Sequence, residues 1–463
     1  MKFEEKFEGT GSLVEKCQPY LDQIHQANGK PVANGKAEAY VRQEVNGKSN
    51  EIQRHNQEAD QWLVIDHKVY NVTDWADKHP GGHRVLNHYA GEDILTGITD
   101  FRAMHLDQDI LKLYLKSLLI GELADVSPSY WPQLVADFQE LHRRLKAMNM
   151  FSATAQVLLH PPCSDIDFGS LAWLILLYFG NGWTVTIFIS FLLTVSQVSN
   201  MMGHLSMFKK SKWNHLMQKF VMCHLKGLSA NWWNYQHFQH HVKPNIYPKD
   251  PDIDVGPLFL LGDSQPVKYG KKKIKYIDYE KQHLYFYMVG LPLLVPIYFN
   301  LQSVQVMYLR KYWVDIAWVI SFYIRYFITF GPFYGIFGTV LLIFFIKFLE
   351  SPWIVFVTQM SHIPMKMSGE ENRDWLSTQV LATCNIEQSF FNNWFTGHLN
   401  FHTEHHLFPT MPRHNYHKVS PLVKSLCAKH GLQYVSKPML KAFGDIVRAL
   451  KKSATLWMDA YYE

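Results

Sequence analysis

The chain has 463 residues, a length that accommodates two or three domains. Apolar residues make up 48% of it and charged residues 18%, below the roughly 25% usual for soluble domains, which favours a membrane protein with soluble parts. The net charge of +5 is mild and gives no reason to expect nucleic acid as a partner. A lysine-rich run at residues 268–275 is interpreted as a cytosolic loop, either facing anionic lipid or simply solvated. The five cysteines are dispersed and form no CxxC pair, which argues against a disulfide framework and a structural zinc site.

The N-terminal quarter predicts a leader followed by a small folded domain. Residues 1–50 are polar and open on charged residues, so we expect a weakly structured leader without a secretory signal peptide. Residues 62–72 alternate apolar and polar side chains, which predicts two short strands joined by a turn. A Pro-Gly-Gly turn follows His79 and can expose its imidazole at the mouth of a pocket, and His105 lies further on. Two histidines facing across an apolar pocket would occupy both axial positions of a haem iron, which then only carries electrons.

These features, together with Gly91-Glu92-Asp93, resemble the cytochrome b5 domain over residues 51–125. The resemblance implies a small α+β domain in which His79 and His105 bind haem b. One departure concerns residues 94–100, which make the link between the ligands about three residues longer than usual, nearly one helical turn. A domain of this fold with weak or no haem is therefore the alternative.

The rest of the chain predicts a membrane domain. Residues 126–160 form a polar connector that we expect to be helical over 131–150. A membrane span needs about 20 apolar residues. The apolar stretches that follow are residues 171–180, 183–195, 285–304, 313–330 and 333–348. Asn181-Gly182 divides the first two, which suggests a re-entrant hairpin or two short spans, and Pro161-Pro162 interrupts the segment before them. We expect about four spans within residues 161–463.

Two histidine triplets stand out within this domain. His237, His240 and His241 form an HxxHH motif, and His402, His405 and His406 repeat the spacing about 160 residues later. On a helix, this spacing places the first and last histidine one turn apart on one face. Neutral imidazole is the commonest metal ligand in proteins and suits iron, zinc and copper. One triplet can be incidental, but two indicate a histidine-rich metal centre with more than one ion.

The triplets also constrain the membrane topology. If both bind one centre, they lie on one membrane face, and an even number of spans separates them. Three apolar stretches lie between the triplets, so one of them should not cross the membrane. We predict that this stretch is residues 333–348 and that it lies in or along the membrane interface. The reasons are that Lys347 and Glu350 follow and that His362 must reach the same face. The leader, the haem domain and the lysine-rich run then share that face, which should be the cytosol.

Two further histidines are candidate ligands. His204 ends the segment Asn200-Met201-Met202-Gly203-His204, in which an asparagine stands one helical turn before the histidine, where a second histidine is expected. His362 ends an apolar segment and is either a ligand or a hydrogen-bonded interfacial histidine.

A haem electron donor joined to a membrane-embedded histidine centre indicates redox chemistry. Breaking an alkane C–H bond needs an oxidised metal–oxygen species, which two irons and O2 provide with two electrons delivered singly by the haem. Zinc fits the nitrogen ligands but has no redox chemistry, so it cannot explain an electron-carrying domain.

The order of cytochrome b5 domain, His-Phe-Gln-His-His and then Asn400-Phe401-His402-Thr403-Glu404-His405-His406 resembles the front-end fatty acid desaturases. Lys249-Asp250-Pro251-Asp252 and Asn385-Ile386-Glu387-Gln388 resemble the vertebrate fatty acid desaturase 2 (delta-6) group in particular. The resemblance implies a multi-pass enzyme of the endoplasmic reticulum membrane, with both termini and its histidine-box cap in the cytosol. It also implies a polyunsaturated fatty acyl-CoA substrate, O2, and NADH-cytochrome b5 reductase as the electron source.

By the same resemblance, the catalytic di-iron centre takes its ligands from three histidine boxes and from His362. The box residues are His204, His237, His240, His241, His402, His405 and His406. The first box usually reads HDxGH, and Asn200 replaces its first histidine here. Two alternatives to a delta-6 desaturase therefore remain: a catalytically impaired desaturase-like membrane protein with a haem-binding or regulatory role, and a sphingolipid desaturase.

Overall fold

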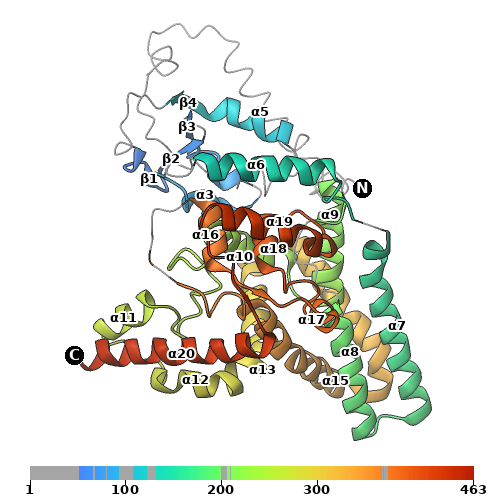
Figure 1. Cartoon of the computed structure of the whole chain (residues 1–463). Helices are drawn as coiled ribbons and strands as arrows, with labels where there is room; N and C mark the ends of the chain where they lie inside the picture. Colours follow the sequence, from blue (N-terminus) through green and yellow to red (C-terminus); the bar gives the residue numbers. More distant parts are fainter. Residues whose placement is uncertain are drawn as a thin grey trace, which may run out of the picture. The chain divides into compact units, whose positions relative to one another are not determined.

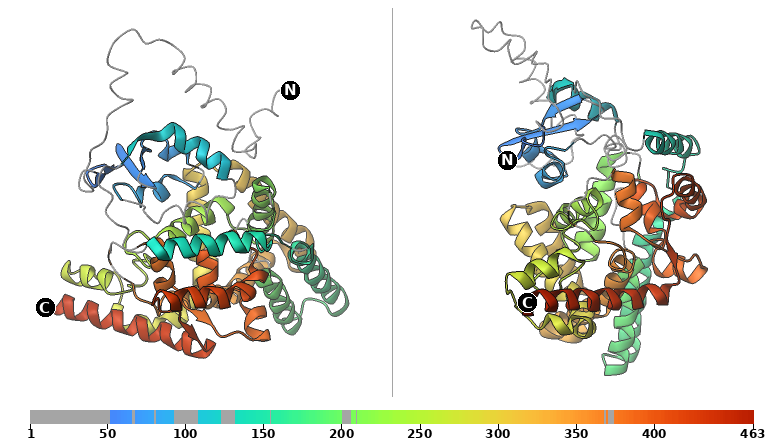
Figure 2. Two further views of the ribbon diagram at one scale, coloured as in Figure 1. Left: turned by 45° about the horizontal axis from the view of Figure 1, so that its top comes forward. Right: turned by 60° about the vertical axis from the view of Figure 1, so that its left-hand side comes forward.

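The computed structural model of the chain (Figures 1 and 2) describes residues 52–65, 68–79, 81–92, 108–122, 132–153, 155–199, 206–208, 210–367, 369 and 374–463. The chain divides into two compact units. Unit 1 comprises Met1–Met148, Phe208–His215 and Arg373–Ser377, and unit 2 the remainder. The predicted leader, residues 1–50, lies outside the described residues, as do Asn200, His204 and His105.

Unit 1 contains a small antiparallel sheet in the order β1-β2-β3-β4. Its strands are β1 (Asn56–Gln57), β2 (Asp60–Ile65), β3 (Lys68–Asn71) and β4 (Leu119–Glu122). The predicted pair of strands is thus confirmed, with Val64 opposite Val69 in the register. Side chains alternate between the two faces of a sheet, so these opposed valines lie on the same face, where they pack with Ile52.

Unit 1 also contains four described helices. They are η2 (Ala76–Lys78), α3 (His83–Asn87), α5 (Gln108–Leu118) and α6 (Pro132–Ala147). Gly82 has a φ of 92°, which an L-residue rarely adopts, so the glycine permits the sharp entry into α3 after His79. The predicted connector helix over residues 131–150 corresponds to α6.

Unit 2 contains a bundle of long apolar helices. α7 (Ala155–Phe179) and α8 (Trp183–Ser199) form a helical hairpin, and α15 (Trp313–Gln359) packs against α8 (Figure 1). Around Asn181-Gly182 the structure shows two helices joined by a short turn, an arrangement that both predicted alternatives share, and α7 continues through Pro161-Pro162. A core formed by Leu176, Ile189, Phe322 and Ile343 joins these helices.

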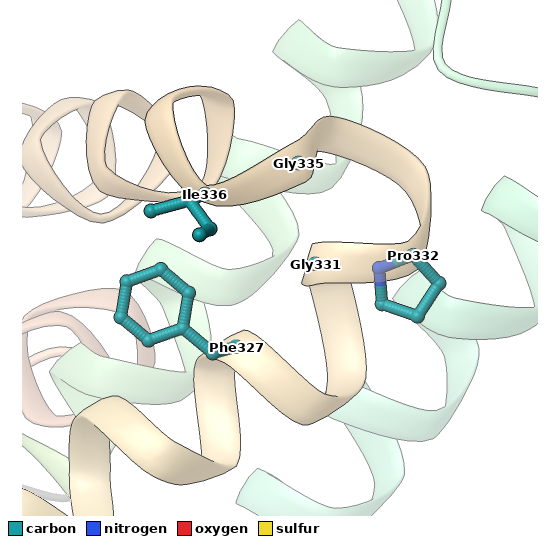
Figure 3. A pocket seen from close by; sticks show the side chains of 5 residues that line it. All are labelled: Phe327, Gly331, Pro332, Gly335 and Ile336. Carbon is teal, nitrogen blue, oxygen red and sulfur yellow. The ribbon is translucent and has the colours of Figure 1, made fainter.

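α15 is itself a hairpin, which corrects the prediction for residues 333–348. Gly335 has φ 66° and ψ −176°, so the helix breaks there, and Figure 3 shows the chain reversing direction between Phe327 and Ile336. The arm after Gly335 packs Leu342 and Ile346 into the bundle core instead of lying along an interface. The sequence prediction failed because it read Lys347 and Glu350 as the end of a membrane segment.

Both of those charged residues are buried in unit 2 and have internal partners. Glu350 accepts a hydrogen bond from the ammonium of Lys226. Lys347 donates to the carbonyl of Lys226 at 3.0 Å and to Oδ1 of Asn300 at 3.2 Å. The contacts of Glu350 and Lys347 with Lys226 therefore link the second arm of α15 to the segment before α10.

Replacing Glu350 by glutamine should destabilise the protein by about 3–5 kcal/mol, because it leaves the buried Lys226 without a counter-charge. Thermal unfolding of the detergent-solubilised full-length chain measures this effect. Asp278→Asn is the control, since Asp278 pairs with Lys281 at the surface, where such pairs contribute little. Equal unfolding temperatures for the two variants would contradict the role given to Glu350.

The remaining described helices and strands precede or follow α15 in the chain. Before α15 they are α9 (Ser211–Lys219), η3 (Phe220–Leu225), α10 (Ala230–Val242), α11 (Ser264–Lys271), η4 (Tyr279–Lys281), α12 (Gln282–Tyr285), η5 (Phe286–Gly290), α13 (Leu291–Leu293), η6 (Leu294–Phe299) and α14 (Asn300–Leu309). After it they are α16 (Trp375–Ala382), β5 (Asn385–Ile386), α17 (Phe390–Phe395), α18 (His402–Leu407), η7 (Arg413–Asn415), α19 (Tyr416–Lys429), β6 (Ser436–Lys437) and α20 (Met439–Tyr462). β5 and β6 pair in parallel. The lysine-rich run predicted as a loop begins inside α11.

Candidate metal centre

α10 carries the first histidine triplet and is anchored at its N-terminus. The Ser229 side chain caps the helix by accepting from the Trp232 amide at 3.0 Å, a contact typically worth about 1 kcal/mol. The buried carboxylate of Asp315 accepts from the Ser229 hydroxyl at 2.6 Å and from the Asn231 amide at 2.9 Å. This negative charge at the positive end of the helix fixes α10 to the first turn of α15.

α18 carries the second triplet and is anchored from its opposite side. The buried carboxyl of Glu404 accepts from Asn385 Nδ2 at 2.8 Å and from the Tyr434 hydroxyl at 2.7 Å. Asn385 Oδ1 in turn accepts from the Thr403 amide at 2.8 Å. Burial raises the pKa of Glu404 above its usual value, although these two donors oppose the shift. Glu404 therefore points away from the histidines and orients the short helix that bears them.

The two triplets meet around His362, which lies just beyond the end of α15. Its Nε2 atom is 3.1 Å from Nε2 of His240, 3.1 Å from Nε2 of His406 and 2.8 Å from Nε2 of His402. We call these four residues the His362 group. The sequence left open whether His362 was a ligand or an interfacial histidine, and the structure places it at the middle of the cluster.

The other ring nitrogens of the His362 group face acceptors. Nδ1 of His240 is 2.9 Å from the Asp250 carboxylate, and Nδ1 of His406 is 2.8 Å from Oε1 of Gln379. Nδ1 of His362 and of His402 face the carbonyls of Ala382 and Leu399, at 3.0 and 3.2 Å. Since these acceptors have no proton to give, Nδ1 carries a proton in each ring, and the four Nε2 atoms converge on one point. Such a convergence is unfavourable without a cation, so the donor set fits a metal ion.

The electrostatic environments of these rings differ. Burial lowers the pKa of His402 to about 3 and holds those of His362 and His406 well below the usual value, so these imidazoles are neutral at physiological pH. Burial also lowers the pKa of His240, but the negative charges of Asp250 and Asp252 outweigh it and raise the value to about 9. In the absence of a metal ion the His240 ring therefore carries a proton on Nε2 as well at physiological pH, and the Asp250 carboxylate helps to make it the most basic ring of the group.

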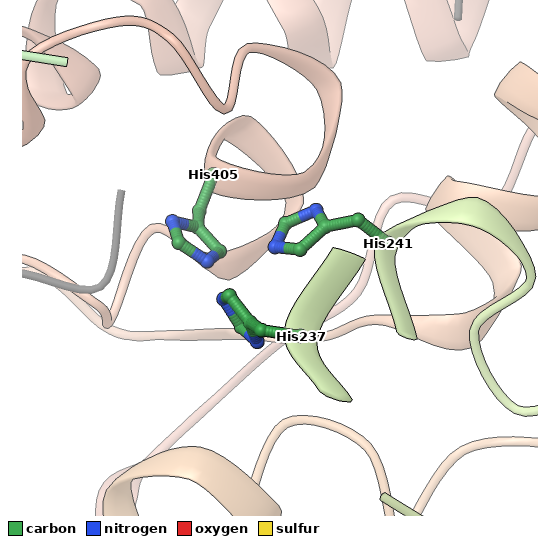
Figure 4. A group of neighbouring side chains, drawn as sticks. All are labelled: His237, His241 and His405. Atoms are coloured by element: carbon green, nitrogen blue, oxygen red, sulfur yellow. The ribbon is translucent and has the colours of Figure 1, made fainter. Parts of the chain in front are cut away.

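A second group lies beside the first and consists of His237, His241 and His405 (Figure 4). One nitrogen from each ring lies within 4.8 Å of the others, a separation that one metal ion can bridge. His237 and His241 come from α10, one helical turn apart, and His405 comes from α18. The His241 ring stacks on His406 with a centroid distance of 4.2 Å, so the two groups are adjacent. We call these three residues the His237 group.

Seven of the predicted site histidines therefore converge. His79 lies in unit 1, where its Nδ1 is 3.3 Å from the Gly82 carbonyl. The structure does not describe His204, Asn200 or His105. The sequence prediction missed the supporting groups Asp250 and Gln379, and the only signal for Asp250 was a charged run close after the first triplet.

Comparisons with known proteins agree with this arrangement. The family model "Fatty acid desaturase" matches residues 181–438, and the model "Cytochrome b5-like Heme/Steroid binding domain" matches residues 48–124. The cytochrome b5-like domain implies haem and the desaturase family implies a di-iron centre, with which the two histidine groups are consistent.

Relatives match over almost all of the chain. Fatty acid desaturase 2-like protein FADS2B of Mus musculus is 72% identical over 100% of both chains. Fatty acid desaturase 3 of Homo sapiens is 49% identical over 89% of this chain and 94% of its own. Among solved structures, cytochrome b5 of Ostreococcus tauri virus 2 is 32% identical over 17% of this chain and 82% of its own, with a TM-score of 0.15. The chain belongs to the fatty acid desaturase family, as a fatty acid desaturase 2-like paralogue with a fused cytochrome b5-like domain.

Proposed function

We propose that the protein is a di-iron acyl-CoA desaturase that inserts a cis double bond between an existing double bond and the carboxyl end of a polyunsaturated chain, of the delta-6 type. The observation that carries the proposal is the pair of adjacent histidine groups, whose nitrogens fit two metal ions. Nitrogen-only donor sets without cysteine suit iron, and the fused electron-carrying domain calls for a redox metal.

The seven described histidines are the proposed ligands. His237, His241 and His405 would hold one iron, and the other would be held by His240, His362, His402 and His406. When bound, the irons supply the O2-dependent oxidation that an unactivated C–H bond requires. His204 is proposed to complete the centre, and it lies outside the described residues.

Burial of these ligands supports the oxidation of an acyl chain. His241 and His406 are fully buried, and His240, His362, His402 and His405 are nearly so. A site closed to bulk water protects a reactive oxidant from side reactions. The proposed supporting groups, Asp250 and Gln379, hold the rings of His240 and His406 with Nε2 directed inward.

The proposed route of electrons runs through the fused domain. His79 and His105 would hold haem b, which would supply single-electron transfer. NADH-cytochrome b5 reductase is the proposed source of these electrons. The family is one of membrane proteins, and we propose the endoplasmic reticulum as its membrane, with the histidine groups and both termini facing the cytosol.

Expression in a desaturase-deficient yeast fed linoleate and alpha-linolenate tests this function. The expected result is the appearance of the delta-6 products of both acids, measured by gas chromatography of total acyl chains. Asn200→His is expressed in parallel, because restoring an imidazole to the first box should raise product formation if that box limits turnover.

The outcomes separate the alternatives. Product only from Asn200→His would identify the wild-type chain as a catalytically impaired relative. Altered sphingoid bases with unchanged fatty acids would identify a sphingolipid desaturase. Unchanged lipids from both chains, with full-length protein confirmed, would contradict an active desaturase.

A further inference from the structure

Among the described residues of unit 2, two helical runs are long and apolar enough to cross a membrane: Tyr279–Leu309 and Trp313–Gln359. The second is the α15 hairpin, which by itself can cross twice. Composition therefore allows three crossings between the two histidine triplets. The geometry of the metal centre decides whether the first run is among them.

Ligands that precede and follow these runs meet at one place. His240 in α10 lies 3.1 Å from His362, between their Nε2 atoms, and His362 comes after the end of α15. Both are therefore on one side of the membrane, and the chain between them crosses an even number of times. Since the two arms of α15 account for two crossings, the run Tyr279–Leu309 contributes none.

We propose that Tyr279–Leu309 lies in the plane of the membrane, on the side of the metal centre, with one apolar face inserted at the boundary between lipid headgroups and acyl chains. Its partner is the bilayer surface. The proposal rests on the membrane character of the family and on the fold, and it holds whether or not the chain is catalytically active.

The inner face of the run packs on a helix that carries exposed charges. Phe286 and Leu291 share a core with Ala442, Ile446 and Leu450 of α20. Gln282 donates to the carbonyls of Leu260 and Leu450 at 3.0 and 2.8 Å.

The opposite side of α20 is charged, and two of its basic residues are paired, Arg448 with Asp445 and Lys452 with Asp263. It exposes Lys441, Arg448, Lys451 and Lys452. Charges of this kind do not lie in the hydrocarbon core, so α20 marks the level of the water interface for the run beside it. Figures 1 and 2 show α20 running across the direction of α7 and α8 rather than along it.

The outer face of the run is apolar and exposed. Its members recur at helical spacing in each half of the run: Leu284, Tyr287, Met288, Leu301, Val304 and Tyr308. Met288 is 75% exposed and Tyr308 72%, more than a buried helix would leave open. The pair Arg310-Lys311 stands at its C-terminal end, where basic side chains suit anionic headgroups.

An aromatic surface continues this face. Phe299 of the run and Phe395 of α17 pack against the same cluster around Val295 and Trp353. α17 itself exposes Phe390 and Trp394. Aromatic side chains are enriched at membrane interfaces, so α17 extends the proposed contact with the bilayer.

The side of the membrane reached by two loops tests the proposal. Two full-length variants each receive a flexible insert containing an N-glycosylation acceptor and a site-specific protease site, one after Lys311 and the other after Gly335. Each is expressed in the endoplasmic reticulum and recovered as sealed microsomes. An identical insert after Glu463 serves as the reference for the side of α20.

The proposal expects the Lys311 insert to be cut from outside the sealed microsomes, like the reference, and the Gly335 insert to be glycosylated and protected. The reverse pattern, with glycosylation after Lys311 and cutting after Gly335, would show that Tyr279–Leu309 crosses and would overturn it. Trypsin applied to sealed microsomes of the unmodified chain provides an independent measurement. Cleavage at Arg310 or Lys311 supports the proposal, and protection of both until detergent is added contradicts it.

Discussion

Replacing His362 by alanine is expected to lower the non-haem iron content from two per chain to about one and to abolish desaturation. His362 contacts His240, His402 and His406 through Nε2, so its loss removes the ligand shared by that group. Loss of a supporting group alone typically costs 10–100-fold in metal affinity or activity, and loss of a direct ligand should exceed about 100-fold.

The measurement is iron per chain by elemental analysis, with haem counted separately from its absorption. His430→Gln is the matched control, since His430 caps α19 and belongs to neither histidine group. If His362→Ala retained the same iron content as His430→Gln, the assignment of the His362 group would be wrong.

Asp250→Asn should weaken iron binding by roughly 10–100-fold while leaving the direct ligands in place. The fully buried carboxylate lies 2.9 and 3.0 Å from Nδ1 of His240, which fixes the ring and strengthens Nε2 as a donor. Iron retained after dialysis against graded chelator concentrations measures the effect. Asp252→Asn provides the comparison and should have a smaller effect, because its carboxylate lies 3.8 Å from the same nitrogen and is partly exposed.

A double-mutant cycle distinguishes a role through His240 from a structural role. Asp250 also accepts from the Asn245 amide at 2.7 Å and the Asp252 amide at 2.9 Å, so its replacement disturbs a loop as well. In a His240→Ala background, Asp250→Asn should cause no further loss of iron if it acts through the imidazole. An undiminished further loss would assign Asp250 to the loop.

The sequence predicted those features that local pattern determines. Alternation between Trp62 and Val72 marked β2 and β3, and the HxxHH spacing placed His237 and His241 one turn apart on α10. The repeated spacing also predicted that the two triplets bind metal at one centre. Two histidine motifs so far apart in the sequence rarely have the same spacing by chance. The structure brings both triplets into contact.

Features that depend on tertiary contacts could not be predicted from the sequence. Lys347 and Glu350 appeared to end a membrane segment, because a partner such as Lys226, more than a hundred residues away, cannot be read from a local window. Gly335 gave no sign of a chain reversal until its left-handed backbone was seen. Gln379 supports His406 by a hydrogen bond that no motif encodes.

Iron and haem counted together in the purified full-length chain test the central claim most directly. The two histidine groups predict two non-haem irons per chain beside one haem iron, with the non-haem irons lost on chelation and the unfolding temperature lowered as they leave. A chain whose iron is accounted for by haem alone, and whose stability is insensitive to chelators and to added ferrous iron, would contradict the proposed di-iron centre.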